Sequence, residues 1–377
     1  MRTISKELIP QSWKDHDLSI KNYLWSHRVL AYTKSTLGLL VLLYGIFSFR
    51  LGLLEVWVES ILEHPFSRWL LYLAAIGVFW ELVSLPFSIG HHSIERSHKL
   101  SKQTYLNWFW DRCKGYFVGI IIGTIALGAL YLCVLYASDL WWAVACVLFI
   151  GLSIVLAQLA PVVLIPLFFK LHPMEPNPLK ERLLNLCKKY GINVFEVYHL
   201  GMGDKTEKGN AAFVGLGKTK RIMIGDTLYK KYSEEEVEAV FAHELGHQLH
   251  NDLWKGIGFS SIMMFVSFYF AKLISETWAL PYFESKFSDP LGIFLFFVVL
   301  SIVQMPMGVL QAAFTRRMEN AADDFALKKI GVGKALADSL EKLTVQNRSQ
   351  FYPNPIREFL SFSHPAPWRR ILRLRQG

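Results

Sequence analysis

Two histidines and a glutamate stand at the spacing that binds and activates a metal ion. His243 and His247 are four residues apart, and Glu244 directly follows the first. Ser233 followed three residues later by Glu236 is typical of a capping box, which predicts a helix that runs through both histidines. Positions four apart lie one above the other on a helix, so both imidazoles can hold one Zn²⁺ at ~2.0–2.1 Å. Glu244 lies about 100° further round, where it can face the metal's water as a general base.

A second acidic pattern follows downstream, and it matters because the five-residue histidine pattern alone arises by chance in long proteins. Glu319 and Asp323 are one helical turn apart, just after an apolar segment. Glu319 as third ligand would leave the fourth position open to water, as a catalytic zinc requires, whereas a structural zinc has four protein ligands. We expect Asp323 to accept the other ring N–H of a ligand histidine. The alternative for Asp323 is a solvated acid or the partner of a lysine such as Lys328. The sequence predicts one zinc per chain.

The composition indicates a membrane protein that must position these residues. Of 377 residues, 52% are hydrophobic and 14% aromatic, which is too apolar for an ordinary soluble enzyme. The net charge of +9 comes from basic residues at the ends of apolar runs, and no nucleic-acid motif is present, so no nucleic-acid partner is expected. The cysteines lack paired spacing and are interpreted as packing residues: Cys113, Cys133, Cys146 and Cys187.

Six apolar segments predict six spanning helices that divide the chain. The spans are expected at about 36–58, 69–89, 116–136, 140–169, 256–280 and 291–314. Arg50 interrupts the first of them. The predicted organisation is an N-terminal cytoplasmic segment at 1–35, four spans within 36–169 with a basic loop near 90–115, a first protease part at 170–255, two spans within 256–314, and a second protease part at 315–377. Pro161 and Pro166 are expected to bend or end the fourth span.

A small sheet is predicted beside the metal helix. Segments 194–199, 211–216 and 221–224 have strand character, and 217–220 joins the last two as a hairpin. An edge strand there can hold an extended peptide across the zinc by main-chain hydrogen bonds.

The distribution of basic residues predicts the side of the membrane. Six spans place both termini and the protease parts on one side. The N-terminal segment and the loop after the second span are rich in Lys and Arg, whereas the opposite loops have little beyond Arg50, Arg68 and Lys286. By the positive-inside rule, the active site is expected on the cytoplasmic side.

Segments outside the zinc motif resemble, in the same order, those of the CAAX prenyl protease 1 family, integral-membrane zinc metalloproteases that process farnesylated proteins and peptides. The resemblance covers most of the chain from about Tyr32 onward, and it is carried by 85–88, 94–98, 103–104, 160–161, 210–215, 221–222, 225–228, 243–247, 319–323 and 363–365. It implies a gluzincin-type protease domain and a ring of spanning helices around a water-filled chamber, with the zinc at its cytoplasmic end. It also implies that Asn210 on the edge strand, and His364 and Arg370 in the tail, act in substrate binding or transition-state stabilisation.

His364 is expected to act in catalysis. Peptide hydrolysis develops negative charge on the carbonyl oxygen, and a preorganised donor there lowers the barrier. Apart from the metal, no such donor is apparent between Asn210 and Glu319. Arg370 would follow on a helix that begins at Pro365, close enough to orient the substrate or a carboxylate of the site. The alternative is that His364 is only a tail histidine beside a helix-starting proline.

The predicted function is that of a membrane zinc metalloendopeptidase acting on peptide or protein substrates, prenylated or membrane-associated. The eukaryotic family members have a further spanning helix before the first one here, which indicates a shorter, prokaryotic-type member in a bacterial inner membrane or a membrane of endoplasmic-reticulum type. A quality-control zinc protease of the same clan is one alternative. A transporter with a zinc domain, suggested by Glu81, His91 and His92, is another, and an inactive scaffold is a third.

Overall fold

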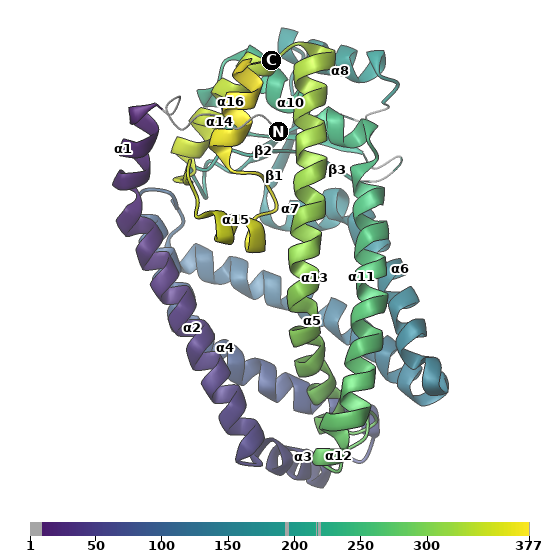
Figure 1. Cartoon of the computed structure of the whole chain (residues 1–377). Coiled ribbons are helices and arrows are strands. Elements are labelled where there is room, and N and C mark those ends of the chain that lie inside the picture. The colour runs from purple at the N-terminus through teal and green to yellow at the C-terminus, as the bar shows by residue number, and fades with distance from the viewer. Residues whose placement is uncertain (1–9, 193–195, 216, 218–219, 377) are drawn as a thin grey trace.

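Long helices form one end of the molecule, and a mixed α/β part forms the other (Figure 1). The structure is a computed structural model that describes residues 10–192, 196–215, 217 and 220–376. Within these residues, six helical stretches are long and apolar enough to cross a membrane: Lys21–Phe47, Pro65–Ser97, Tyr105–Tyr136, Ser138–Phe168, Asp252–Tyr282 and Pro290–Ile330.

The first span differs from its prediction. Helix α1 (Gln11–Ser19) leads into α2 (Lys21–Phe47), so helix already occupies much of the segment expected to precede the first span. Phe49 then takes a left-handed conformation with φ of 57°, and the separate helix α3 (Arg50–Ile61) follows. The predicted span 36–58 is therefore wrong at both ends. Polar residues can extend a helix beyond the hydrocarbon region, and the turn at Phe49 lies next to Arg50, which was expected to interrupt the span.

The predicted basic loop near 90–115 is also mostly helical. Helix α4 (Pro65–Ser97) and helix α5 (Tyr105–Tyr136) reach into it from both sides. A short 3₁₀ turn leads from α5 into α6 (Trp141–Leu159), so the predicted antiparallel pair is present. Pro161 lies in a π-helical turn before α7 (Ile165–Phe168), where its missing N–H disturbs the ladder as expected.

The sheet has four strands in the order β1-β2-β4-β3. These strands are β1 (Lys170–Pro173), β2 (Val197–Gly201), β3 (Ala211–Val214) and β4 (Arg221–Gly225). Strand β2 pairs with β4 in parallel, and the other pairs are antiparallel, so β3 is an edge strand as predicted. Strand β1 was not predicted because it is short and ends in a proline. Residues 194–195, 216 and 218–219 of the predicted strands and turn lie outside the described residues.

Helices that come before and after the last two spans in the sequence build the α/β part around one core. They are α8 (Pro178–Lys189), α9 (Asp226–Lys231), α10 (Glu234–Leu249), α14 (Gly333–Gln346), α15 (Pro355–Ser361) and α16 (Pro367–Gln376). Leu183, Leu245 and Ile371 from three of them are fully buried in this core. Trp13 of α1 stacks on Phe351 at 4.8 Å between ring centroids. Burial of each such side chain contributes about 1.5–3 kcal/mol, so the N-terminal helix is attached firmly to the α/β part.

Candidate metal centre

The helix that carries the two histidines begins where the capping box predicts. The Ser233 side chain accepts a hydrogen bond from the Glu236 backbone N–H, and the Glu236 carboxylate accepts one from the Ser233 N–H. The helix α10 then continues to Leu249. Asn251, with φ of 54°, turns the chain into α11 (Asp252–Ile274), which is a candidate span. After α11, the helix α12 (Leu280–Tyr282) and a turn, the long helix α13 (Pro290–Phe325) brings Glu319 back to α10.

A glycine allows the two helices to approach closely. A Cβ atom on Gly246 would lie 3.1 Å from Cα and 3.3 Å from the carbonyl oxygen of Ala322 in α13. Such contacts with backbone atoms cannot relax without moving one of the helices. Gly246 lies between the ligand candidates on α10, and Ala322 lies next to Asp323 on α13. The glycine inside the histidine motif therefore sets the helix separation that the site needs.

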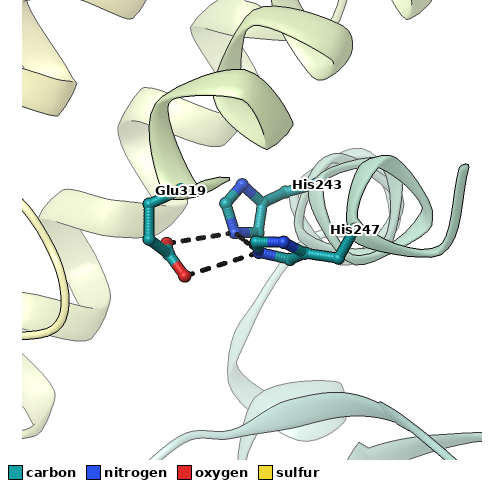
Figure 2. Close-up of side chains that lie close together, drawn as sticks. All are labelled: His243, His247 and Glu319. Carbon is teal, nitrogen blue, oxygen red and sulfur yellow. Dashed lines mark hydrogen bonds and ion pairs between the residues drawn. The ribbon is translucent and has the colours of Figure 1, made fainter. Parts of the chain in front are cut away.

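The side chains of His243, His247 and Glu319 converge on one point (Figure 2). The two Nε2 atoms are 3.2 Å apart, and they lie 3.5 Å and 3.4 Å from the nearest Glu319 oxygens. Tetrahedral zinc with bonds of 2.0–2.1 Å would separate its ligands by about 3.3 Å. Glu319 and His243 are buried, and Glu319 Oε2 has no hydrogen-bond partner in the described part of the chain. These side chains fit a divalent metal ion with three protein ligands.

Carboxylates behind the histidines hold both rings in the required orientation. Asp323 Oδ1 lies 3.0 Å from His243 Nδ1, and Asp252 Oδ2 lies 2.8 Å from His247 Nδ1. Each Nε2 atom is thereby turned toward Glu319. Burial lowers the pKa of His247, but Asp252 and Glu319 outweigh it and raise that pKa to about 10. The carboxylates around the two histidines therefore favour a bound cation.

Asp252 is a functional candidate that the sequence reasoning missed. It stands five residues after His247, beyond the end of α10, and its side chain is buried. Only its position at the first residue of α11, the helix that follows the motif helix, could have indicated it. We expect Asp252→Asn to weaken zinc affinity by about 10–100-fold, because the amide cannot hold the His247 N–H as a carboxylate does. Zinc titration of the purified variant measures this, with Asp324→Asn as a control that changes an exposed acid. Unchanged affinity would make Asp252 a packing residue.

Asp323 is the centre of a buried ion-pair network and not a solvated acid. Its carboxylate receives two hydrogen bonds from Arg370, at 2.9 Å and 2.7 Å, and one from Arg373 at 2.9 Å. Arg370 Nη1 also lies 3.4 Å from Glu319 Oε2. Lys328, the alternative partner considered for Asp323, pairs with Asp324 instead. The network connects α16 to the ligand-bearing helix α13.

We predict that Asp323→Ala weakens metal binding or activity by about 10–100-fold. The structure adds an expected loss of about 3–5 kcal/mol in the free energy of unfolding, because the buried Arg370 would lose both hydrogen bonds to Asp323 and keep only its contact with Glu319. Metal analysis and thermal unfolding of the detergent-purified variant measure the two effects. Asp324→Ala, one residue away and exposed, is the matched control. Normal zinc content with normal stability would show that the network is dispensable.

Glu244 is half-buried beside the ligands and the edge strand. Burial raises the pKa of the Glu244 carboxyl group, whereas His243, His247 and a hydrogen bond with the Phe213 backbone in β3 lower it; the net direction is upward. Its carboxyl group lines the same cavity as the three ligand candidates. This position, beside the metal ligands but outside them, is the one required of a general base.

A cavity of about 730 Å³ contains the metal site and all the remaining predicted site residues, including Asn210, His364 and Arg370. Asn210 immediately precedes β3, and its carbonyl accepts a hydrogen bond from Gly225. His364 is exposed in the cavity, with Nε2 3.3 Å from Glu319 Oε1. The helix after it begins at Pro367 and not at Pro365, as the two prolines keep the intervening chain irregular. Arg370 is buried against Asp323, so its guanidinium contacts a carboxylate of the site and is little exposed to the cavity.

The polar residues that suggested a transporter have structural partners. Glu81 of α4 pairs with Arg112 of α5. His91 Nδ1 lies 2.6 Å from His27 Nδ1, and the His92 ring stacks on Trp108. None of them contributes to the metal site, which His243, His247 and Glu319 alone form among the described residues.

Two family models match this chain, one over each half. The family described as peptidase family M48 matches residues 173–377, and the one described as "CAAX prenyl protease N-terminal, five membrane helices" matches residues 16–170. The chain is 27% identical to CAAX prenyl protease 1 of Saccharomyces cerevisiae over 326 residues, 81% of this chain and 71% of that one. It is 23% identical to the uncharacterised metalloprotease YhfN of Bacillus subtilis over 323 residues, 84% and 76% of the two chains.

A solved structure shows the same fold. The crystal structure of Ste24p from S. mikatae matches with a TM-score of 0.88 at 23% identity, over 99% of this chain and 91% of that one. The predicted fold class, a multi-pass helical membrane protein with a metalloprotease domain and a small sheet, is confirmed.

Proposed function

The chain belongs to peptidase family M48 and is a membrane metalloprotease, and from that premise we propose that it is a zinc endopeptidase with one zinc ion per chain. His243, His247 and Glu319 would hold the zinc. The convergence of their three ligand atoms at tetrahedral separations, inside a cavity that also contains Glu244, carries this proposal. Nitrogen and carboxylate donors in a buried, negative site favour zinc over the oxygen-only coordination typical of magnesium or calcium.

The protein's own residues account for the proton transfers. When bound, zinc supplies Lewis-acid activation of water and of the substrate carbonyl. Glu244 takes a proton from the attacking water and later returns it to the leaving amine. Asp252 and Asp323 keep the ligand histidines in one tautomer, and Arg370 holds Asp323 and Glu319 in place.

The edge strand offers a place for the peptide. Among the described residues, strand β3 pairs with β4 alone, and α10 packs beside it, so the outer edge of β3 faces the metal site. A substrate strand added there would present its backbone to Glu244 and the ligands. Asn210, at the start of β3, would bind the substrate backbone through its exposed side-chain amide.

We predict that His364→Ala lowers kcat by about 10²–10³-fold with zinc and folding retained. The side chain is exposed in the cavity close to Glu319, where an imidazole can donate a hydrogen bond to the developing oxyanion. Steady-state kinetics on a peptide, with zinc content measured on the same sample, tests this. His172→Ala, an exposed histidine of β1 that does not line the cavity, is the control. An unchanged kcat would leave oxyanion stabilisation to other groups.

The substrate class is proposed to be peptides and proteins at the membrane, prenylated ones included. Relatives carry the name CAAX prenyl protease 1, and this supports the extension to prenylated substrates without restricting the chain to them. Cleavage of one peptide with and without a farnesylated cysteine distinguishes the two cases. Equal rates would show that the prenyl group is not recognised.

We propose that the active site faces the cytoplasm, in a bacterial inner membrane or a membrane of endoplasmic-reticulum type. The sheet and α16 lie at one end of the molecule, and α3 and α12 lie at the other (Figure 1). The second end includes the sparsely basic loops, which supports the orientation. Labelling of a single cysteine introduced at Lys188 from either side of sealed vesicles tests it.

The direct test is peptide cleavage by the purified, zinc-loaded protein. Removal of the metal with a chelator should abolish cleavage, and added zinc should restore it. Cleavage that persists in metal-free protein would refute the proposed function.

A further inference from the structure

Three arginines gather at one wall of the cavity. Arg348 and Arg357, from the segment after α14 and from α15, line the cavity directly. Arg28 of α2 reaches the same wall, because its Nη2 donates a hydrogen bond of 2.8 Å to Gln350, which also lines the cavity. Three separate segments of the chain therefore place guanidinium groups beside the chamber that contains the metal site.

These three arginines have no carboxylate partner among the residues that the structure describes. The guanidinium of Arg348 lies 6.0 Å from the centre of the Tyr23 ring, and that of Arg357 lies 5.5 Å from the centre of the Phe362 ring. The Nε atom of Arg28 is buried and has no hydrogen-bond partner. Burial and the positive charge of Arg28 lower the pKa of Arg357, so these two guanidinium groups repel each other.

Three arginines of α16, by contrast, have carboxylate partners. Arg370 and Arg373 both bind Asp323, and Arg375 binds Asp338 at 2.8 Å. Guanidinium groups that lie close together without a carboxylate repel one another, which costs free energy. The planar donor fork of arginine matches a carboxylate or phosphate, often through two hydrogen bonds. An anion from outside the chain would complete this wall.

We propose that Arg28, Arg348 and Arg357 form a subsite that binds a carboxylate of the peptide substrate. The inference rests on the proposed function, since that function brings a peptide into this cavity. A peptide supplies such a group either from its C-terminus or from an Asp or Glu side chain. A lipid phosphate has similar chemistry, but the wall belongs to the same cavity as Glu244 and the metal ligands, which favours the substrate.

The test uses three peptides of otherwise identical sequence. The first has a free C-terminal carboxylate and no acidic side chain, the second is its C-terminal amide, and the third is the amide with a C-terminal Glu. Binding is measured by fluorescence anisotropy on zinc-loaded Glu244→Gln protein, and kcat and KM are measured on the unsubstituted enzyme. We expect a carboxylate peptide to bind about 10–100-fold more tightly than the plain amide. We expect the same preference to appear in KM and not in kcat. Whether the first or the third peptide shows the gain identifies the source of the carboxylate.

Variants assign the preference to the arginines. Arg348→Gln and Arg357→Gln should each remove most of it while zinc content and binding of the plain amide stay unchanged. Arg68→Gln removes the same charge at the far end of the molecule and should keep the preference. Equal binding of all three peptides, or a preference that survives both cavity variants, overturns the proposal. So does arginine-dependent binding of anionic vesicles without any peptide preference. Carboxylate preference in binding without any cleavage would support the subsite and count against the peptidase function.

Discussion

Replacement of Glu244 by Gln is expected to lower peptide cleavage by about 10²–10⁴-fold while zinc remains fully bound. The amide keeps the shape of the side chain and some of its hydrogen bonds, but it cannot accept a proton from water. The metal ligands His243, His247 and Glu319 are unchanged in this variant. The combination of lost activity and retained metal therefore distinguishes a general base from a ligand. Cleavage and zinc content are measured on the same purified sample.

Glu235→Gln is the matched control, because it makes the same change at an exposed position of the same helix. It should leave both zinc content and cleavage near the unsubstituted values. Full activity in Glu244→Gln would remove the proton-transfer role argued here. Loss of zinc together with activity would instead place Glu244 among the groups that hold the metal.

Local patterns in the sequence indicated the three side chains that converge in the structure. The spacing of His243 and His247 depends only on helix geometry, and the capping box at Ser233 fixes where that helix begins. Glu319 lies on a different helix, but its own motif and the apolar segment before it indicated it as a candidate ligand. Each of these signals is contained within a few residues, so no knowledge of tertiary packing was needed.

The rest depends on contacts between distant segments. Asp252 reaches His247 only because Asn251 adopts a left-handed conformation that turns the chain at the end of α10. The pairing of Asp323 with Arg370 joins residues 47 positions apart. No periodicity encodes such contacts. The ends of the first span were misplaced for a related reason, since hydropathy registers apolar content and not the residues at which a helix begins and ends.

The wall of three arginines illustrates the same limit. Arg28 was counted among the basic residues that set the orientation in the membrane, and that interpretation treats it only as a charge. Arg28 lies beside Gln350 because α2 packs near the segment after α14, and this tertiary contact cannot be predicted from the sequence. Charge counts along a sequence report the sum of charges, whereas function depends on which charges lack a partner.

Replacement of Glu319 by Ala is expected to remove zinc and activity together. The carboxylate is the single ligand supplied by α13, and the two histidines that remain cannot hold zinc in a tetrahedral site with one open position. The loss of zinc affinity should exceed the 10–100-fold expected for the outer partner Asp252. His243→Ala and His247→Ala should behave in the same way. Zinc content by elemental analysis and peptide cleavage are measured for each variant.

The control separates loss of a ligand from loss of packing. His250 lies three residues after His247, and its ring packs against Phe325 with centroids 6.2 Å apart, away from the three ligand candidates. His250→Ala should therefore lower thermal stability slightly and keep full zinc and activity. Because Arg370 retains Asp323 when Glu319 is removed, Glu319→Ala should still fold, and circular dichroism can verify this. A folded Glu319→Ala protein with full zinc and normal cleavage would show that another group completes the site.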